Sequence, residues 1–167
     1  MNYVDHCMTN QEKDALFVDF MSSDEEMKVY EEVIDFPRLR DYLNEKLDEY
    51  NKQKKITIMD IVLFTDAIIH ISRIYRVINL KRGHALLVGV GGSGRHSLTR
   101  LSAYISNMNV DQLEIRKDFT LKDFRFKLCE LYELAAYKGV RAGKEKLKTV
   151  FIFSDNDVID EAFLEDI

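Results

Sequence analysis

The chain has 167 residues, of which 46% are hydrophobic and 32% are charged, and its formal net charge at pH 7 is −5. This composition is typical of one soluble globular domain and excludes a disordered chain. The longest apolar runs are far shorter than the roughly 20 residues of a membrane helix, and the polar N-terminus lacks a signal-type apolar region. We therefore expect no membrane span and no export, and the acidic balance without a basic stripe argues against a nucleic-acid partner.

The two cysteines, Cys7 and Cys129, are too few for a disulfide framework or a cysteine-based zinc site. This usage fits a reducing, intracellular compartment. We expect Cys129 to lie on the inward face of its helix, as a buried thiol.

Residues 1–80 are predicted to form one helix after another, because their apolar positions recur at helical spacing. A capping box of Ser23 and Glu26 and a stop at Pro37 divide this region. The predicted helical segments are Asn10–Met21, Ser23–Ile34, Leu39–Tyr50 and Thr57–Ile78.

The pattern changes at residue 84. Ala85–Val88 is a short apolar run that predicts a buried strand, and four of the seven glycines follow within Gly89–Gly94. A helical stretch, Ser97–Ser106, comes next, so the three segments form a strand–loop–helix unit.

Further alternation follows along the chain. Val110–Arg116 is predicted as a second strand, Thr120 and Asp123 cap a helix, and Thr149–Phe153 is predicted as a third strand. The order β-α-β-α-β behind a helical segment predicts an α/β fold with a mainly parallel sheet.

The glycine-rich segment matches most of the phosphate-binding P-loop pattern, in which a glycine, four residues and a second glycine precede lysine and then serine or threonine. Gly89 and Gly94 have the correct spacing, and such a loop lets backbone N–H groups and the following helix N-terminus surround a phosphate. Arg95 replaces the lysine, which keeps the positive charge but changes its geometry. His96 stands where a hydroxyl should reach Mg²⁺, and imidazole is a poor ligand for that ion.

Hydrolysis also requires an apolar strand that ends in acidic residues. At the end of the third predicted strand, Ser154 occupies the metal-side position and Asp155 the water-activating position. Because His96 and Ser154 both weaken the metal contacts, we expect a site that holds nucleotide and turns it over slowly or not at all.

These motifs resemble the degenerate P-loop of the fourth AAA+ module of axonemal dynein heavy chains. The resemblance rests on the run from Ala85 to Ser102, on Phe151–Asp155 and Phe163–Ile167, and on the upstream Met59–Phe64 and His70–Ile74. His96 departs from the glutamine expected in that family. The resemblance covers residues 30–167 and implies a partial AAA+ P-loop NTPase three-layer fold.

The resemblance divides the chain into residues 1–55, a helical linker from the preceding module, and 56–167, a partial AAA+ large subdomain. It implies a C-terminally truncated piece whose parallel sheet is incomplete, with Ala85–Val88 lacking its neighbour on one side. The expected cofactor is ATP or ADP, with Mg²⁺ weak or absent. The residues expected to hold nucleotide are Ile61, Val62, Leu63, Phe64, Gly89, Val90, Gly91, Gly92, Ser93, Gly94, Arg95, His96 and Ser97, with Ser154 and Asp155 on the metal side.

The resemblance further implies a part of a microtubule motor of cilia and flagella, located in the cytoplasm, the cytoskeleton and the axoneme. The expected partners are neighbouring AAA+ modules of the same heavy chain, whereas intermediate chains, light chains and microtubules are reached only through the full-length protein. We expect no catalytic activity from this piece alone, with Asp155 positioning or vestigial. Two alternatives stay open: a competent P-loop ATPase that uses Arg95 and Asp155, and a helical interaction scaffold whose site is empty.

Overall fold

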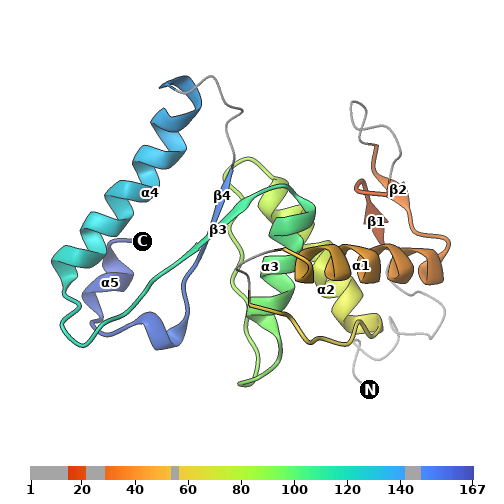
Figure 1. The fold of residues 1–167 in the computed structure, drawn as a ribbon, viewed down its shortest axis with the longest axis horizontal. Helices are drawn as coiled ribbons and strands as arrows, with labels where there is room; N and C mark the ends of the chain where they lie inside the picture. Colours follow the sequence, from red (N-terminus) through yellow and green to blue (C-terminus); the bar gives the residue numbers. More distant parts are fainter. Residues whose placement is uncertain (1–14, 22–28, 54–56, 142–147) are drawn as a thin grey trace, which may run out of the picture. The chain divides into compact units, whose positions relative to one another are not determined.

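The computed structural model describes residues 15–21, 29–53, 57–141 and 148–167. These residues belong to two compact units, Met1–Ile105 and Ser106–Ile167, called unit 1 and unit 2 below (Figure 1). The boundary between the units does not coincide with the expected division between residues 55 and 56. That division separates a linker of the preceding module from the AAA+ part, and it stays a prediction. Within the described residues, no helix is both long enough and apolar enough to cross a membrane.

The first elements that the structure describes in unit 1 are two short paired strands, called the hairpin below, where helices were predicted. Strand β1 (Phe17–Val18) pairs antiparallel with β2 (Glu31–Glu32), and the amide of Val33 donates to the carbonyl of Leu16 over 2.7 Å. The predicted helices Asn10–Met21 and Ser23–Ile34 are therefore wrong for the parts that the structure describes. The predicted capping box of Ser23 and Glu26 lies outside the described residues.

The physical reason lies in the side-chain alternation of β1 and the residues after it. Val18 and Phe20 are buried while Phe17 is 45% exposed, which is the two-residue period of a strand. The Phe20 ring stacks on Tyr42 at a centroid distance of 5.6 Å and meets Tyr75 edge-on at 4.7 Å. These contacts attach the hairpin to the helices that follow.

Helix α1 (Phe36–Asn51) confirms the helix predicted after Pro37. Asp35 caps it by accepting from the amide of Arg38 over 3.0 Å, and the proline occupies the first turn, where a missing N–H costs nothing. One face is buried at a spacing of three to four residues: Leu39, Leu43, Leu47 and Tyr50.

Helix α2 (Thr65–Asn79) begins eight residues later than the predicted start at Thr57. The side chain of Asn51 donates to the carbonyl of Met59 over 2.9 Å and accepts from its amide over 2.8 Å. These two bonds fix the backbone around Met59 in a non-helical conformation, and the Met59 side chain is buried. Residues 57–64 consequently form a connecting segment and not a first helical turn.

Helix α3 (Arg95–Ile105) packs against α2 and α1 in unit 1 (Figure 1). The buried hydroxyl of Ser102 bonds the carbonyl of Ile71 on α2 over 3.2 Å and that of Leu98 over 2.8 Å. A small side chain at this position allows the two helices to approach each other closely. The helix confirms the helical stretch predicted after the glycine loop.

The predicted buried strand Ala85–Val88 is not observed. These residues pair with no strand in the described part of the chain, and Leu86 and Val88 are 89% and 86% exposed. Leu87 alone of the run packs against the core of unit 1. A strand requires a hydrogen-bonded neighbour, so an apolar run without one stays an extended segment.

Unit 2 contains a parallel pair of strands joined through a helix. Strand β3 (Asn109–Gln112) pairs with β4 (Thr149–Ile152) in the register Asn109 to Thr149, and α4 (Leu121–Arg141) connects them. This βαβ connection confirms the predicted α/β class and its parallel pairing. The predicted second strand extended to Arg116, whereas the observed pairing ends at Gln112.

Helix α4 begins at the predicted cap. The carboxylate of Asp123 accepts from the Thr120 amide over 2.8 Å and from its hydroxyl over 2.6 Å. These bonds stabilise the charged form and hold the pKa of Asp123 below its usual value. These bonds confirm the helix cap that the sequence predicted at Thr120 and Asp123.

The core of unit 2 lies under α4. The ring of Phe124 stacks on Phe163 of α5 (Ala162–Glu165) at 4.3 Å, and both side chains are fully buried. Leu128 lies on the same face of α4, but Cys129 is exposed, so the expectation of a buried thiol is wrong. The next residue along a helix is rotated by about 100°, which turns Cys129 away from the core.

Candidate functional site

The glycine loop connects the extended segment 85–88 to α3 in unit 1. Gly92 and Gly94 have φ angles of +77° and +74°, a backbone conformation that glycine adopts without strain. The amide of Ser93 donates to the carbonyl of Val90 over 3.3 Å, which closes a turn inside the loop. Two of the glycines predicted for phosphate binding therefore have backbone angles that residues with a side chain rarely adopt.

The loop leads directly into the N-terminus of α3. The first helical hydrogen bond runs from the amide of Leu98 to the carbonyl of Gly94 over 2.9 Å. The amides of the preceding turn, from Gly94 to Ser97, have no helical carbonyl to bond, and the helix dipole places partial positive charge at this end. Backbone N–H groups in this position can donate hydrogen bonds to an anion.

Arg95 is the first residue of α3, and its guanidinium turns back toward the segment before the loop. Its Nη1 atom donates to the carbonyl oxygen of Leu87 over 3.1 Å. His96, the next residue, is exposed, and Ser97 is half-buried.

The residues expected beside an adenine, Ile61–Phe64, lie in the connecting segment before α2. Val62 and Phe64 are 81% and 59% exposed, whereas Leu63 is buried. Leu63 belongs to the same hydrophobic cluster as Leu98 of α3, against which Leu87 also packs. The structure therefore attaches this segment and both ends of the glycine loop to one core.

The metal-side residues lie in unit 2, directly after β4. Ser154 begins the 3₁₀ turn η1 (Asp155–Asp157), and its hydroxyl and amide both donate to Oδ2 of Asp157, over 2.7 and 2.8 Å. Asp155 is exposed, while Asp157 is only 7% exposed. Sequence reasoning missed Asp157, although its position three residues after Ser154 is the spacing of a capping box.

Ser154 and Asp155, the residues expected on the metal side, differ in their surroundings. The hydroxyl proton of Ser154 is committed to Asp157, and the exposed Asp155 is the nearest carboxylate along the chain. Within the ranges that the structure describes, no three His, Cys, Asp or Glu side chains form a cluster suited to a metal ion.

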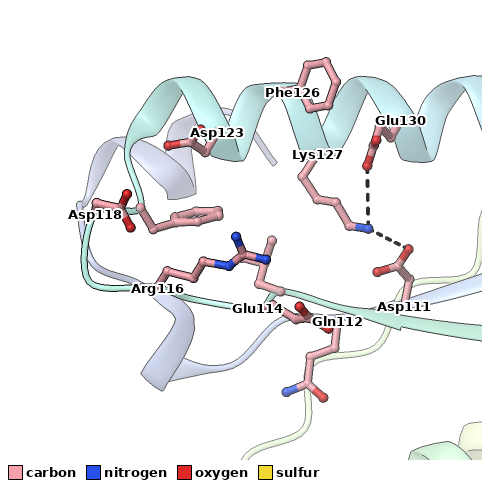
Figure 2. A pocket seen from close by; sticks show the side chains of 11 residues that line it. Asp111, Gln112, Glu114, Arg116, Asp118, Asp123, Phe126, Lys127 and Glu130 are labelled. Carbon is pink, nitrogen blue, oxygen red and sulfur yellow. Dashed lines mark hydrogen bonds and ion pairs between the residues drawn. The ribbon is translucent and has the colours of Figure 1, made fainter.

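A separate pocket of about 380 Å³ lies in unit 2, between α4 and the segment that follows β3 (Figure 2). Lys127 points toward Asp111, with an Nζ to Oδ2 distance of 3.0 Å, and lies 3.8 Å from Glu130 (Figure 2). Five acidic and two basic side chains line it, so its net charge disfavours a polyphosphate. None of the residues predicted for the site lines this pocket.

A βαβ unit, and a glycine loop that leads into a helix, are both parts of the local architecture of P-loop nucleotide-binding proteins. The family model described as "P-loop containing dynein motor region D4" matches residues 59–167. The chain belongs to this dynein family, and the predicted fold, a partial AAA+ P-loop fold, agrees with the match.

Individual relatives are dynein heavy chains. The dynein-1-beta heavy chain of the flagellar inner arm I1 complex of Chlamydomonas reinhardtii is 42% identical over 151 residues, 90% of this chain. Dynein axonemal heavy chain 2 of Mus musculus is 41% identical over 162 residues, 97% of this chain. The flagellar outer arm dynein beta chain of Chlamydomonas reinhardtii is 40% identical over 140 residues, 84% of this chain. The chain spans about 3% of the length of each of these relatives, and the matches confirm the predicted resemblance to axonemal dynein heavy chains.

Proposed function

We propose that the chain is a nucleotide-binding part of an axonemal dynein heavy chain and binds ATP or ADP as a structural or regulatory ligand, with weak or no hydrolysis. The observation that carries this proposal is the glycine loop, whose positive-φ glycines Gly92 and Gly94 lead directly into the N-terminus of α3. Backbone amides at such a junction favour phosphate, independently of the protein's acidic net charge.

The phosphates would lie against residues 89–97. Amides of the loop and of the first turn of α3 would donate to the phosphate oxygens, and the guanidinium of Arg95 would add positive charge. The adenine would lie beside residues 61–64, where Val62 and Phe64 expose apolar side chains next to the buried Leu63. Ligand sites are lined mainly by apolar and aromatic side chains, and these two residues would supply such contacts to a flat base.

Weak hydrolysis follows from the metal side. In competent P-loop enzymes an acid at the strand end helps to hold Mg²⁺, which neutralises charge during phosphoryl transfer. This chain offers Ser154, whose hydroxyl is bonded to Asp157, and His96 at the second metal-side position. The affinity for nucleotide would therefore depend mainly on backbone contacts and little on Mg²⁺.

The relatives' names place their own proteins in flagellar inner and outer arms. By extension, we infer an axonemal location in a cilium or flagellum for the protein that carries this chain. Its immediate partners would be neighbouring AAA+ modules, to which the bound nucleotide would transmit conformational information. Microtubules and the intermediate and light chains would be contacted by other parts of the same heavy chain.

The test is equilibrium binding of a fluorescent ATP analogue to the full chain, with Mg²⁺ and with a chelator. We expect saturable binding that changes less than about threefold between the two conditions and that weakens about tenfold in Arg95→Ala, the loss of one charge-assisted contact. Arg40→Ala, at an exposed position on α1, is the matched control for removal of one positive charge. Absence of saturable binding would contradict the proposal.

A competent ATPase is the second candidate, because the carboxylate of Asp155 is exposed immediately after β4. That reading predicts multi-turnover ATP hydrolysis that requires Mg²⁺ and collapses in Asp155→Asn. The proposal made above predicts that Asp155→Asn leaves both nucleotide affinity and the residual rate within about threefold of the unsubstituted chain.

A further inference from the structure

Arg95 closes the base of the glycine loop. Its Nη1 atom lies 3.1 Å from the carbonyl oxygen of Leu87, eight residues earlier in the chain. Arg95 is the first residue of α3. Leu87 lies before the loop, and its side chain packs on the core of unit 1. The bond therefore joins the two ends of the loop directly.

The remaining loop is held by few contacts. Residues 88–93 are exposed, and Val88 and Val90 are 86% and 80% exposed, so side-chain packing does not fix them. Glycines at three of these positions add conformational freedom to the backbone. A hydrogen bond between the ends consequently has a large effect on how many shapes the loop can adopt.

Gly89 lies beside the side chains of Ser93 and Arg95. A Cβ atom at Gly89 would lie 3.6 Å from Cδ of Arg95 and 3.1 Å from Oγ of Ser93. The second distance is tighter than ordinary contacts, so a side chain at residue 89 would press on Ser93 beside the arginine. The absence of a side chain at residue 89 therefore leaves room for Ser93, and the arginine stem passes at ordinary contact distance.

We propose that Arg95 is a positioning residue that clamps the glycine loop in its anion-binding shape, in addition to supplying charge. Guanidinium carries five N–H donors in a planar fork, and the bond to Leu87 uses one of them. The others stay available to a phosphate. Lysine concentrates its donors on one flexible ammonium nitrogen, so it cannot span the loop base and meet a phosphate in the same rigid way.

The clamp itself is tested without nucleotide, by ¹⁵N relaxation of the full chain. In the unsubstituted chain we expect rigid amides at Gly91, Gly92 and Gly94, with order parameters of about 0.85. In both Arg95→Ala and Arg95→Lys we expect flexible amides at these positions, with order parameters below about 0.6. Arg40→Lys on α1 is the matched control and should leave the loop unchanged. Unshifted amide signals from α1 and α2 show that each variant is folded.

Nucleotide affinity then separates shape from charge. This step rests on the proposed function. We expect Arg95→Lys to weaken binding of the fluorescent ATP analogue by about threefold although the charge is retained, which is part of the larger effect of Arg95→Ala. Order parameters and affinity that are both preserved in Arg95→Lys would overturn the clamp while leaving nucleotide binding intact. A loop that loosens in both variants, in a chain that binds no nucleotide, would support the clamp and refute the proposed function instead.

Discussion

The hydroxyl of Ser154 donates a hydrogen bond of 2.7 Å to Oδ2 of Asp157, and the Ser154 amide donates to the same oxygen over 2.8 Å. Asp157 is 7% exposed, so this carboxylate depends on Ser154 for hydrogen bonds that water supplies elsewhere. The pair fixes the turn that follows β4 and directs the hydroxyl proton of Ser154 toward the protein. In the proposed function, this bonded hydroxyl stands at the position where P-loop hydrolases place a metal-side acid.

Removing this bond should destabilise unit 2. We expect Asp157→Ala to lower the free energy of unfolding by about 1 to 2 kcal/mol, the usual effect of losing a capping side chain at a partly buried position. Urea unfolding measures the difference. The control is Asp155→Ala in the same turn, which is exposed and should change the free energy by no more than about 0.5 kcal/mol. Equal effects of the two substitutions would show that the bond to Ser154 contributes nothing.

The ring stack of Phe124 on Phe163 should dominate the core of unit 2. Phe124→Ala removes a fully buried ring, and we expect a loss of about 3 to 5 kcal/mol in the free energy of unfolding. Phe126→Ala on the same helix is the matched control, because that ring is 67% exposed. Thermal unfolding followed by circular dichroism compares the two, and a larger effect at Phe126 would contradict the assigned core.

Gly83 should tolerate no side chain. A Cβ atom there would lie 1.8 Å from the carbonyl oxygen of Val77, so the end of α2 would have to move. We expect Gly83→Ala to cost about 1 to 3 kcal/mol of unfolding free energy, as overpacking does. Gly91→Ala is the control, since open space surrounds that position. If denaturant unfolding finds the two variants equally stable, the close approach to Val77 is not present in solution.

Tyr75 should make unit 1 sensitive to alkaline pH. Burial first, and the nearby Asp19 carboxylate second, raise the pKa of Tyr75 above its ordinary value of 10.0. A raised pKa in the folded state means that the unfolded chain loses this proton first, so stability is intact below about pH 10 and falls as pH rises above it. We expect Tyr75→Phe to flatten that fall in unfolding experiments across this range.

The matched control for Tyr75 is Tyr132→Phe, at a position that is 64% exposed on α4. The two variants remove the same hydroxyl group from a buried and from an exposed ring. An equal change in the pH slope for both would refute the role of Tyr75.

Local signals in the sequence predicted the elements whose determinants are local. Asp123 and Thr120 mark the start of α4, Pro37 marks the first turn of α1, and the glycines before Arg95 mark the loop and the start of α3. Each depends on residues within one or two turns, so a single sequence contains the necessary information.

Non-local contacts account for the errors. Phe17 pairs with Glu32, fifteen positions later in the chain, and the residues of neither segment indicate the partner. The late start of α2 depends on the side chain of Asn51 bonding Met59. In the candidate site, the glycine spacing predicted the loop, but the bond of Arg95 to Leu87 could be found only from the folded chain.

In the proposed function, the glycine loop and the first turn of α3 hold the phosphates of ATP or ADP. Its most direct test is a titration of the ¹⁵N-labelled full chain with ATP in the presence of a chelator, followed through the amide signals. We expect saturable shifts concentrated at Gly91, Gly92, Gly94, Arg95 and His96, with similar affinity when Mg²⁺ is added. Shifts confined to other residues, or none at saturating ATP, would contradict it.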